Sequence, residues 1–312
     1  MESSNADKAQ RKFVTRDLSK LCTMSQEPGF VVPTDISKNQ ARKLRIFIEK
    51  QTLKKQRRLR ERTERKERYG IWPQHLQGIS KSERNEKIRQ ILKAAQGTSQ
   101  RLCIDLSWDM CMNDKEISHL SDQLKRSYSI LRRSLKPLHL YLCNFSKGSR
   151  IYNMCCKKHK GFTEYVIDQK EEGVTECFPL NDIVYLSPDS KNELTSLDIS
   201  KVYIVGGLVD ISIQKNRSLA FAQEHNIQTA RLPIDSFLKQ GNDPTKPFKK
   251  VLTIDQVVFA IQSFYENNDW KSALVEAMPK RMGFVEKTDH QQKVPAAEVL
   301  SSDSDASIEG SK

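Results

Sequence analysis

The sequence predicts an α/β domain with a largely parallel sheet, preceded by a basic helical arm. Short apolar runs alternate with helix-forming stretches in the C-terminal two thirds of the chain, a pattern typical of a sheet covered by helices. Most of the excess positive charge lies N-terminal to these alternating stretches. Residues 38–68 contain 14 Lys and Arg against 4 Glu, whereas residues 101–281 contain 25 Lys and Arg against 22 Asp and Glu. Such an arm suits a polyanionic partner.

The N-terminal third lacks the apolar runs of a packed domain. Residues 1–37 are polar and show no sustained hydrophobic period, which predicts disorder. Residues 38–68 contain no Gly or Pro and consist mainly of good helix formers, so they predict a helix with solvent on almost all sides. A run this basic predicts a phosphate-binding arm, and a solvated helix without a partner is the alternative. Glycine and proline interrupt residues 69–98, which we interpret as a linker.

Residues 99–285 carry the alternating pattern of one folded domain. The apolar runs predict strands at 102–106, 138–143, 183–186, 201–205 and 229–232. Helices are expected at 116–133 and 215–224. A third helix is expected after Thr253, because Thr253 and Gln256 have the spacing of a capping box and an apolar stripe follows them. The tail at 286–312, rich in Ser and Asp, is predicted to be disordered.

Missing motifs argue against several common chemistries. The chain contains neither a GxGxxG fingerprint nor a P-loop, which argues against a dinucleotide-dependent enzyme or an NTPase. The six histidines show no metal-binding spacing and the seven cysteines form no CxxC pair, so we expect no metal and a reducing compartment. Residues 1–20 are polar and charged and lack the apolar stretch of a secretory signal, and no apolar run in the sequence approaches the roughly 20 residues that span a bilayer. We therefore expect an intracellular protein of the nucleus or cytoplasm, without a membrane partner.

Three predicted strands are followed by segments that suit a ligand site. In open parallel sheets, ligands bind beyond the carboxyl ends of the strands. The segments at these ends are residues 185–190, 205–210 and 230–235. The glycine pair in the second segment permits close approach of backbone to a ligand, and Asp210 ends that segment. Taken singly, such a glycine is more often part of a turn, and such an aspartate more often caps a helix.

Five short motifs occur in order between residues 101 and 285. They are CIDLS at 103–107, QLKRSYSxxRR at 123–133, VYLSPDS at 184–190, VYIVGGLVD at 202–210 and TARLPI at 229–234. This ordered set resembles the tRNA position-nine N1-purine methyltransferases of the SPOUT superfamily. The segment 209–215, VDISIQK, is most like the B-type animal paralogue. The basic arm fits the same family.

The resemblance implies a fold that periodicity does not show. It is a SPOUT-type parallel sheet flanked by helices, with its C-terminal part tied in a trefoil knot. The family's cofactor, S-adenosylmethionine, sits bent in that knot and is held mainly by backbone groups of three loops. Apolar loops with exposed amides suit a slot for adenine. The matching positions are Leu186, Ser187, Gly206, Gly207, Leu232 and Pro233, with Val251, Leu252 and Thr253 as the wall for adenine.

The resemblance assigns the general base to Asp210, and we expect Asp105 and Gln123 to orient the guanine. N1 of guanine carries a proton at neutral pH, so its methylation requires that this proton leave. N1 of adenine has a free lone pair and needs no base beforehand. An aspartate beside the methyl donor therefore favours guanine, with adenine as the alternative substrate. The expected product is N1-methylguanosine at position nine of tRNA.

We expect tRNA to be bound by both the arm and the domain. Each phosphate contact should steepen the salt dependence of binding. The alternative for Arg126 and Arg132 is a solvated helix face. Two other functions are kept open: a non-catalytic tRNA-binding partner that retains the fold, and a metal-dependent nuclease, for which clustered carboxylates are missing. The resemblance implies that the protein acts as a monomer. The expected tRNA-binding residues are Lys54, Lys55, Arg57, Arg58, Arg126, Arg132 and Lys147.

Overall fold

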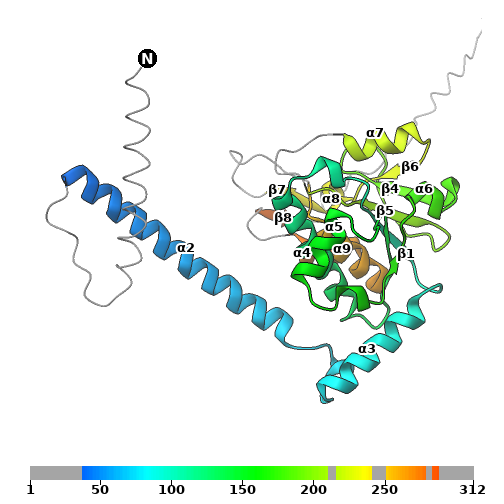
Figure 1. Cartoon of the computed structure of the whole chain (residues 1–312), viewed down its shortest axis with the longest axis horizontal. Helices are drawn as coiled ribbons and strands as arrows, with labels where there is room; N and C mark the ends of the chain where they lie inside the picture. Colours follow the sequence, from blue (N-terminus) through cyan, green and yellow to red (C-terminus); the bar gives the residue numbers. More distant parts are fainter. Residues whose placement is uncertain (1–36, 210–215, 241–250, 279–282, 288–312) are drawn as a thin grey trace, which may run out of the picture. The chain divides into compact units, whose positions relative to one another are not determined.

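The chain divides into two units, residues 1–74 and 75–312. The computed structural model describes residues 37–209, 216–240, 251–278 and 283–287 (Figure 1). In the first unit, helix α2 spans Lys38–Gly70 and has 33 residues. It covers the stretch whose lack of Gly and Pro predicts a helix, because Lys, Arg, Glu and Gln lose little side-chain freedom in a helix. The function of this arm stays a prediction.

The second unit contains a six-stranded sheet in which every neighbouring pair is parallel. The strand order is β3-β2-β1-β5-β4-β6, which confirms the predicted parallel α/β architecture. All five apolar runs predicted as strands form strands, with shifts of one or two residues at their ends. The strands are β1 (Arg101–Asp105), β2 (His139–Cys143), β3 (Asp168–Gln169), β4 (Ile183–Leu186), β5 (Val202–Gly206) and β6 (Gln228–Ala230). The trefoil knot stays a prediction.

The helices pack on the two faces of this sheet (Figure 1). Helices α4 and α9 pack against each other, and α9 also contacts β5, whereas α7 contacts β4 and β6. Besides α2, the α-helices are α3 (Lys81–Ala95), α4 (Asp114–Leu131), α5 (Arg150–Lys158), α6 (Val174–Cys177), α7 (Arg217–Glu224), α8 (Ile234–Phe237), α9 (Ile254–Asn267) and α10 (Trp270–Ala277). Short 3₁₀ helices span Gln74–Leu76, Asp109–Cys111, Phe162–Glu164 and Leu180–Asp182. An antiparallel pair, β7 (Leu238–Gln240) and β8 (Phe284–Glu286), lies outside the main sheet.

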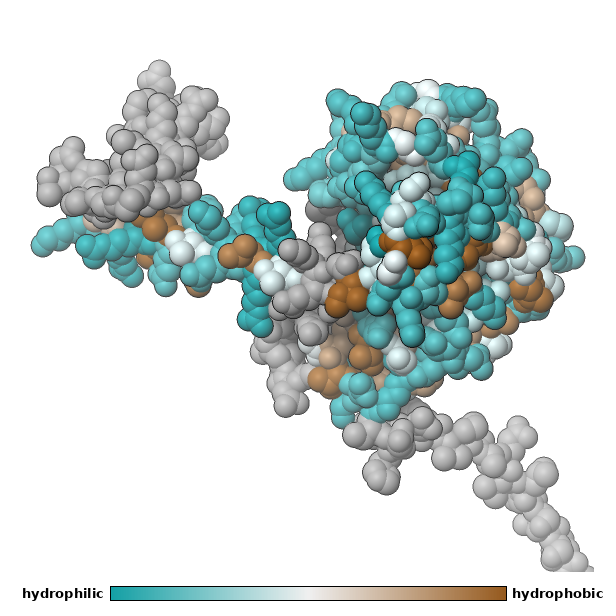
Figure 2. Space-filling model, turned by 90° about the horizontal axis from the view of Figure 1, so that it is seen from below, coloured by the Kyte–Doolittle hydropathy of each residue, from teal (hydrophilic) through white to brown (hydrophobic). Residues whose placement is uncertain are grey.

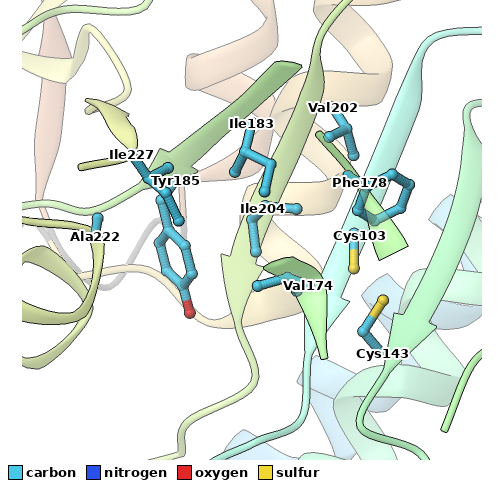
Figure 3. Packing of buried hydrophobic residues seen from close by; sticks show 10 residues of the cluster. All are labelled: Cys103, Cys143, Val174, Phe178, Ile183, Tyr185, Val202, Ile204, Ala222 and Ile227. Carbon is cyan, nitrogen blue, oxygen red and sulfur yellow. The ribbon is translucent and has the colours of Figure 1, made fainter. Parts of the chain in front are cut away.

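The central strands are buried on both faces, which explains their continuous apolar sequence. In β4 all four residues are buried, and in β1 the last four are buried. Alternate residues of β4 and β5 form one hydrophobic cluster with Cys103 of β1, Cys143 of β2 and residues of α6 and α7 (Figure 3). Cys103 and Cys143 belong to this cluster as free thiols, as expected of cysteines that replace small hydrophobic residues.

Helix α3 lies in the segment that sequence analysis interprets as a linker. The Ser80 hydroxyl accepts a hydrogen bond from the Glu83 backbone N–H (3.2 Å), and the Glu83 carboxylate accepts one from the Ser80 backbone N–H (2.9 Å). This reciprocal capping box starts the helix, and Ile88, Leu92 and Ala95 form its buried side. The residues of α3 belong to the second unit, so this unit begins well before residue 99.

A buried histidine ties the end of α3 to the sheet. His139 Nδ1 accepts the Gly97 backbone N–H at 2.9 Å, so Nε2 carries the proton and donates it to Asp168 at 2.9 Å. Gln96 donates to the other carboxylate oxygen of Asp168 at 2.8 Å. Burial lowers the pKa of His139, and this effect outweighs the opposing effect of Asp168. The neutral histidine thus joins α3, β2 and β3.

The described surface is mainly polar. Figure 2 shows one face of the molecule, on which hydrophilic residues dominate and hydrophobic residues form small patches. Across the described residues, no helix combines the length and the apolar character needed to cross a membrane. In the same residues, no group of three His, Cys, Asp or Glu side chains is placed to hold a metal ion.

Candidate functional site

Three loops at one edge of the sheet enclose a pocket. Strands β5, β4 and β6 are neighbours and run parallel, so their C-terminal ends lie together. Residues from the segments 186–189, 205–208 and 231–235 follow these ends and line a cavity of about 270 Å³. The first residues of α7 and α9 complete its wall. The three segments singled out in the sequence therefore converge.

Six of the nine residues predicted to bind a cofactor line this cavity. They are Leu186, Ser187, Gly206, Leu232, Val251 and Leu252. The other three do not line it, although each is the direct neighbour of a residue that does: Gly207, Pro233 and Thr253. The lining is largely apolar, which suits a planar aromatic ring.

The glycine pair at the end of β5 is required by two close approaches. A Cβ on Gly207 would lie 2.6 Å from the backbone oxygen of Asp105 and 2.7 Å from Leu106 Cδ2. The Gly207 backbone N–H donates to the same oxygen at 2.7 Å, so this loop lies directly against the end of β1. A Cβ on Gly206 would meet side chains instead, with Ser218 Oγ at 3.1 Å. Glycine is thus required most strictly at position 207.

The predicted catalytic residue Asp105 lies in a buried polar network at the end of β1. Its side chain is fully buried. One carboxylate oxygen accepts the Ser107 backbone N–H (3.0 Å) and the Asn144 side-chain amide (3.1 Å), and the other accepts the hydroxyls of Ser107 (3.0 Å) and Tyr185 (2.9 Å). Burial, together with the nearby Asp105 charge, raises the pKa of Tyr185 well above its usual value, so its hydroxyl remains a donor. Asp105 is not part of the pocket lining.

The second predicted orienting residue, Gln123, caps the helix beside the pocket. Its buried side-chain oxygen accepts the Ile254 backbone N–H at 2.8 Å, one of the N–H groups at the start of α9 that lack a partner within the helix. Gln256 in turn accepts the Thr253 backbone N–H at 2.9 Å, which confirms the predicted capping box. Gln123 thereby holds the helix start whose Ile254 lines the cavity.

One charged cluster at the pocket is built around Arg231. The Arg231 guanidinium donates to the backbone oxygen of Ser190 (2.9 Å) and to the Glu193 carboxylate (2.9 Å). Ser236 donates to the other carboxylate oxygen of Glu193 at 2.7 Å. Burial raises the pKa of Glu193, but the hydrogen bonds from Ser236 and Arg231 outweigh it, so the net shift is downward. This cluster joins the loops after β4 and β6.

Asp210, predicted as the general base, lies outside the described residues. The described chain ends just before it at Val209, whose backbone N–H lies 3.4 Å from Met112 Sδ. Leu208, two residues before Asp210, lines the cavity. The role of Asp210 stays a prediction.

Comparison with known proteins decides the family. The model of the family described as tRNA (guanine(9)-N(1))-methyltransferase TRM10/TRM10A matches residues 34–283. The chain belongs to the TRM10 family of tRNA methyltransferases. The family predicted from the five ordered motifs is therefore confirmed.

Curated relatives extend this result. The chain is 38% identical over 253 residues to tRNA methyltransferase 10 homolog B of Bos taurus, covering 80% of this chain and 79% of the relative. It is 32% identical over 281 residues to the tRNA (guanine(9)-N1)-methyltransferase of Schizosaccharomyces pombe, covering 82% and 86%. Among solved structures, full-length spTrm10 in complex with SAH matches with a TM-score of 0.52 and 34% identity, covering 59% of this chain and 98% of that chain. The B-like resemblance is confirmed.

In this TRM10 family member, all four arm residues predicted to bind tRNA lie on α2 with exposed side chains: Lys54, Lys55, Arg57 and Arg58. Arg57 also pairs with Glu61 one turn later at 2.8 Å. Such an exposed pair contributes little to stability and leaves the guanidinium accessible.

The three domain residues predicted to bind tRNA differ in their surroundings. Arg126 makes a two-pronged ion pair with Asp255 at 2.6 and 3.2 Å, which joins α4 to α9. Arg132 ends α4 and donates to Asn85 of α3 at 2.9 Å. Lys147 is exposed in the loop between β2 and α5. Arg126 and Arg132 therefore connect helices, in addition to any contact with RNA.

Sequence reasoning missed three residues of the site. Tyr185 and Arg231 belong to the predicted strand-end segments 185–190 and 230–235, and Arg217 belongs to a predicted helix, but the sequence assigns none of the three a role of its own. The signal for Tyr185 was a hydroxyl inside an apolar run, because a buried tyrosine usually finds a hydrogen-bond partner. No local sequence pattern identifies Asp105 as the hydrogen-bond partner of Tyr185.

Proposed function

We propose that this protein is an S-adenosylmethionine-dependent tRNA methyltransferase that forms N1-methylguanosine at position nine. The observation that carries the proposal is the convergence of three strand-end loops on one apolar cavity. Membership of the TRM10 family supports the tRNA substrate, and the name of the S. pombe relative supports guanine at position nine. The complex of spTrm10 with SAH supports the cofactor.

The cavity residues suit the adenosyl group of this cofactor. Leu186, Leu232, Val251 and Leu252 supply apolar surface for the purine, and Gly206 allows the ligand to approach the backbone. When bound, the cofactor supplies an activated methyl group on a sulfonium. The protein must therefore align the target base and remove one proton.

We assign proton removal to Asp210. In the sequence it follows Leu208, which lines the cavity, by two residues. N1 of guanine must lose its proton for methylation, and a carboxylate at this position can accept it. For Asp105 and Gln123 the hydrogen bonds favour positioning roles over the guanine contacts predicted from sequence, because Asp105 holds four donors and Gln123 caps α9.

Binding of tRNA is proposed to involve α2 together with the domain. Between residues 38 and 62 the helix carries exposed Lys and Arg, which suits a phosphate backbone. We also retain as proposals the trefoil knot around the cofactor site, action as a monomer, and a location in the nucleus or cytoplasm. The family and the parallel sheet support the knot, and the basic arm supports binding without a second subunit.

The activity test uses the full-length protein and two tRNA transcripts that differ only at position nine, one with guanine and one with adenine. Calorimetry with SAH measures cofactor binding, and transfer of a tritiated methyl group measures turnover. We expect SAH binding, and N1-methylguanosine in the first transcript only. Transfer to the adenine transcript would show the alternative specificity. Tight tRNA binding with no transfer to either transcript would show a non-catalytic partner and overturn the proposal.

The role of Asp210 is tested with Asp210→Asn. Loss of a general base lowers the rate by about 10²–10⁴-fold. We expect such a loss of turnover with unchanged SAH affinity, and recovery of rate at higher pH, where guanine N1 is deprotonated more readily. Asp182→Asn is the matched control. It makes the same substitution directly before the N-terminal end of β4, whereas the cavity lies at the C-terminal end of that strand. Wild-type turnover of Asp210→Asn would refute the assignment.

A further inference from the structure

The cavity presents four charged side chains, and they differ in their partners. The two terminal nitrogens of Arg231 donate to Ser190 and Glu193 and so join two loops. Asp235 and Asp189 are carboxylates on the loops after β6 and β4. The remaining charge is Arg217, the first residue of α7. In the part of the chain that the structure describes, its guanidinium makes no hydrogen bond or ion pair.

Local geometry holds Arg217 at the cavity. The preceding residue, Asn216, has a left-handed backbone (φ 64°), and its N–H donates to the Asp189 carboxylate at 3.1 Å. The loop after β4 thus anchors the start of α7. The following residue, Ser218, lies beside the glycine pair, since its Oγ is 3.1 Å from the position of a Cβ on Gly206. The backbone of Arg217 therefore lies between Asn216, which Asp189 anchors, and Ser218, which lies beside Gly206.

An arginine without a partner beside an apolar cavity favours an anionic group on the ligand. Guanidinium binds carboxylates in a two-pronged geometry, and such charge-assisted bonds are about twice as strong as neutral ones. S-adenosylmethionine and SAH carry one carboxylate, at the end of the methionyl or homocysteinyl group, while their adenosyl group is uncharged. The apolar side of the cavity suits the adenosyl group, which leaves the carboxylate for the charged side.

We propose that Arg217 binds the α-carboxylate of the cofactor's amino-acid group. This inference rests on the proposed function and names the part of the cofactor that one side chain recognises. In this arrangement the hydrogen bond from the Asn216 N–H to Asp189 positions the start of α7, whose first residue, Arg217, lines the cavity. Arg217 then makes the site selective for cofactors that retain the amino-acid group over adenosine thioethers that lack it.

The test compares two ligands that differ in the amino-acid group. SAH contains it, whereas 5′-methylthioadenosine retains the adenosyl thioether without it. Calorimetry on the full-length protein measures both affinities for wild type, Arg217→Gln, Arg217→Lys and the control Arg89→Gln, an exposed arginine on α3. We expect Arg217→Gln to weaken SAH by on the order of tenfold or more and to leave methylthioadenosine unchanged. Arg217→Lys should recover part of the loss, and the control should match wild type.

Three results would overturn the inference, and each is distinguishable from failure of the proposed function. Equal weakening of both ligands by Arg217→Gln would show a change in pocket shape. Unchanged SAH affinity with a higher KM for tRNA would place Arg217 on the RNA. Unchanged values throughout would show no role in either. If the wild-type protein bound neither SAH nor methylthioadenosine, the proposed cofactor would be wrong. The role inferred for Arg217 would then be wrong as well.

Discussion

Alanine substitutions in the glycine pair should separate stability from ligand binding. In Gly207→Ala the new methyl would meet the Asp105 backbone oxygen at 2.6 Å and Leu106 Cδ2 at 2.7 Å. That oxygen belongs to β1, which pairs with β5 at this level, so it cannot move without disturbing the sheet. Overpacking costs about 1–3 kcal/mol, and loss of the Gly207 N–H bond costs about 0.5–1.5 kcal/mol. The expected loss of stability is about 1.5–4.5 kcal/mol, or roughly 3–18 °C in Tm.

Gly206→Ala should have a small effect on stability and a direct effect on ligand binding. Its methyl would meet the Ser218 hydroxyl at 3.1 Å and the Tyr185 hydroxyl at 3.3 Å, and these side-chain atoms can shift by a few tenths of an ångström. The expected cost is about 1 kcal/mol or less. Gly206 lines the cavity and Gly207 does not, so the methyl at 206 should weaken SAH binding directly.

Thermal denaturation and SAH calorimetry of both variants measure this difference. The reasoning would be refuted if Gly207→Ala melted at the wild-type temperature, or if Gly206→Ala lost more stability than Gly207→Ala. Wild-type SAH affinity in a folded Gly206→Ala protein would show that the ligand does not approach this glycine.

Three further predictions concern buried polar groups. Tyr185→Phe removes a hydrogen bond to the buried Asp105 carboxylate, so urea unfolding should show a loss of about 1.5–3 kcal/mol, and a loss near zero would contradict the role of this network. Gln123→Met leaves the buried Ile254 N–H without its acceptor; the same assay should show a loss of about 1–3 kcal/mol, and unchanged stability would show that the cap is dispensable. Because burial lowers the pKa of His139, the unfolded chain binds its proton more readily than the folded one. Unfolding free energy should therefore fall as pH falls below about 6.5, and His139→Asn should flatten that slope; an unchanged slope would assign the pH dependence to other groups.

Much of the secondary structure was predictable because its causes are local. Strands buried on both faces need apolar side chains at every position, so β1, β4 and β5 appear as continuous apolar runs. The capping box of α9 involves residues three apart, and it was identified from spacing alone. Helix α3 has an equivalent box at Ser80 and Glu83, but its largely charged sequence hid the short apolar stripe. The local signal was present there, and the polar composition outweighed it.

The chemistry of the site depended on contacts between distant segments. Asp105 was identified as a candidate from its motif, but its partner Tyr185 lies 80 residues away. Arg126 was predicted to bind RNA, and it pairs with Asp255 across 129 residues. Such pairs form only when folding brings two distant segments into contact. Residue spacing within either segment does not predict that contact.

The sequence by itself determined the apolar runs, the helix starts, the basic arm and, through five ordered motifs, the family. Each of these depends on interactions within a few residues or on residue identity. Only the tertiary structure decided that β5, β4 and β6 are neighbours, that their loops enclose one cavity, and that Arg217 stands at it without a partner among the described residues. The physical reason is that strand order and cavity shape follow from packing the whole sheet against its helices, which no local pattern encodes.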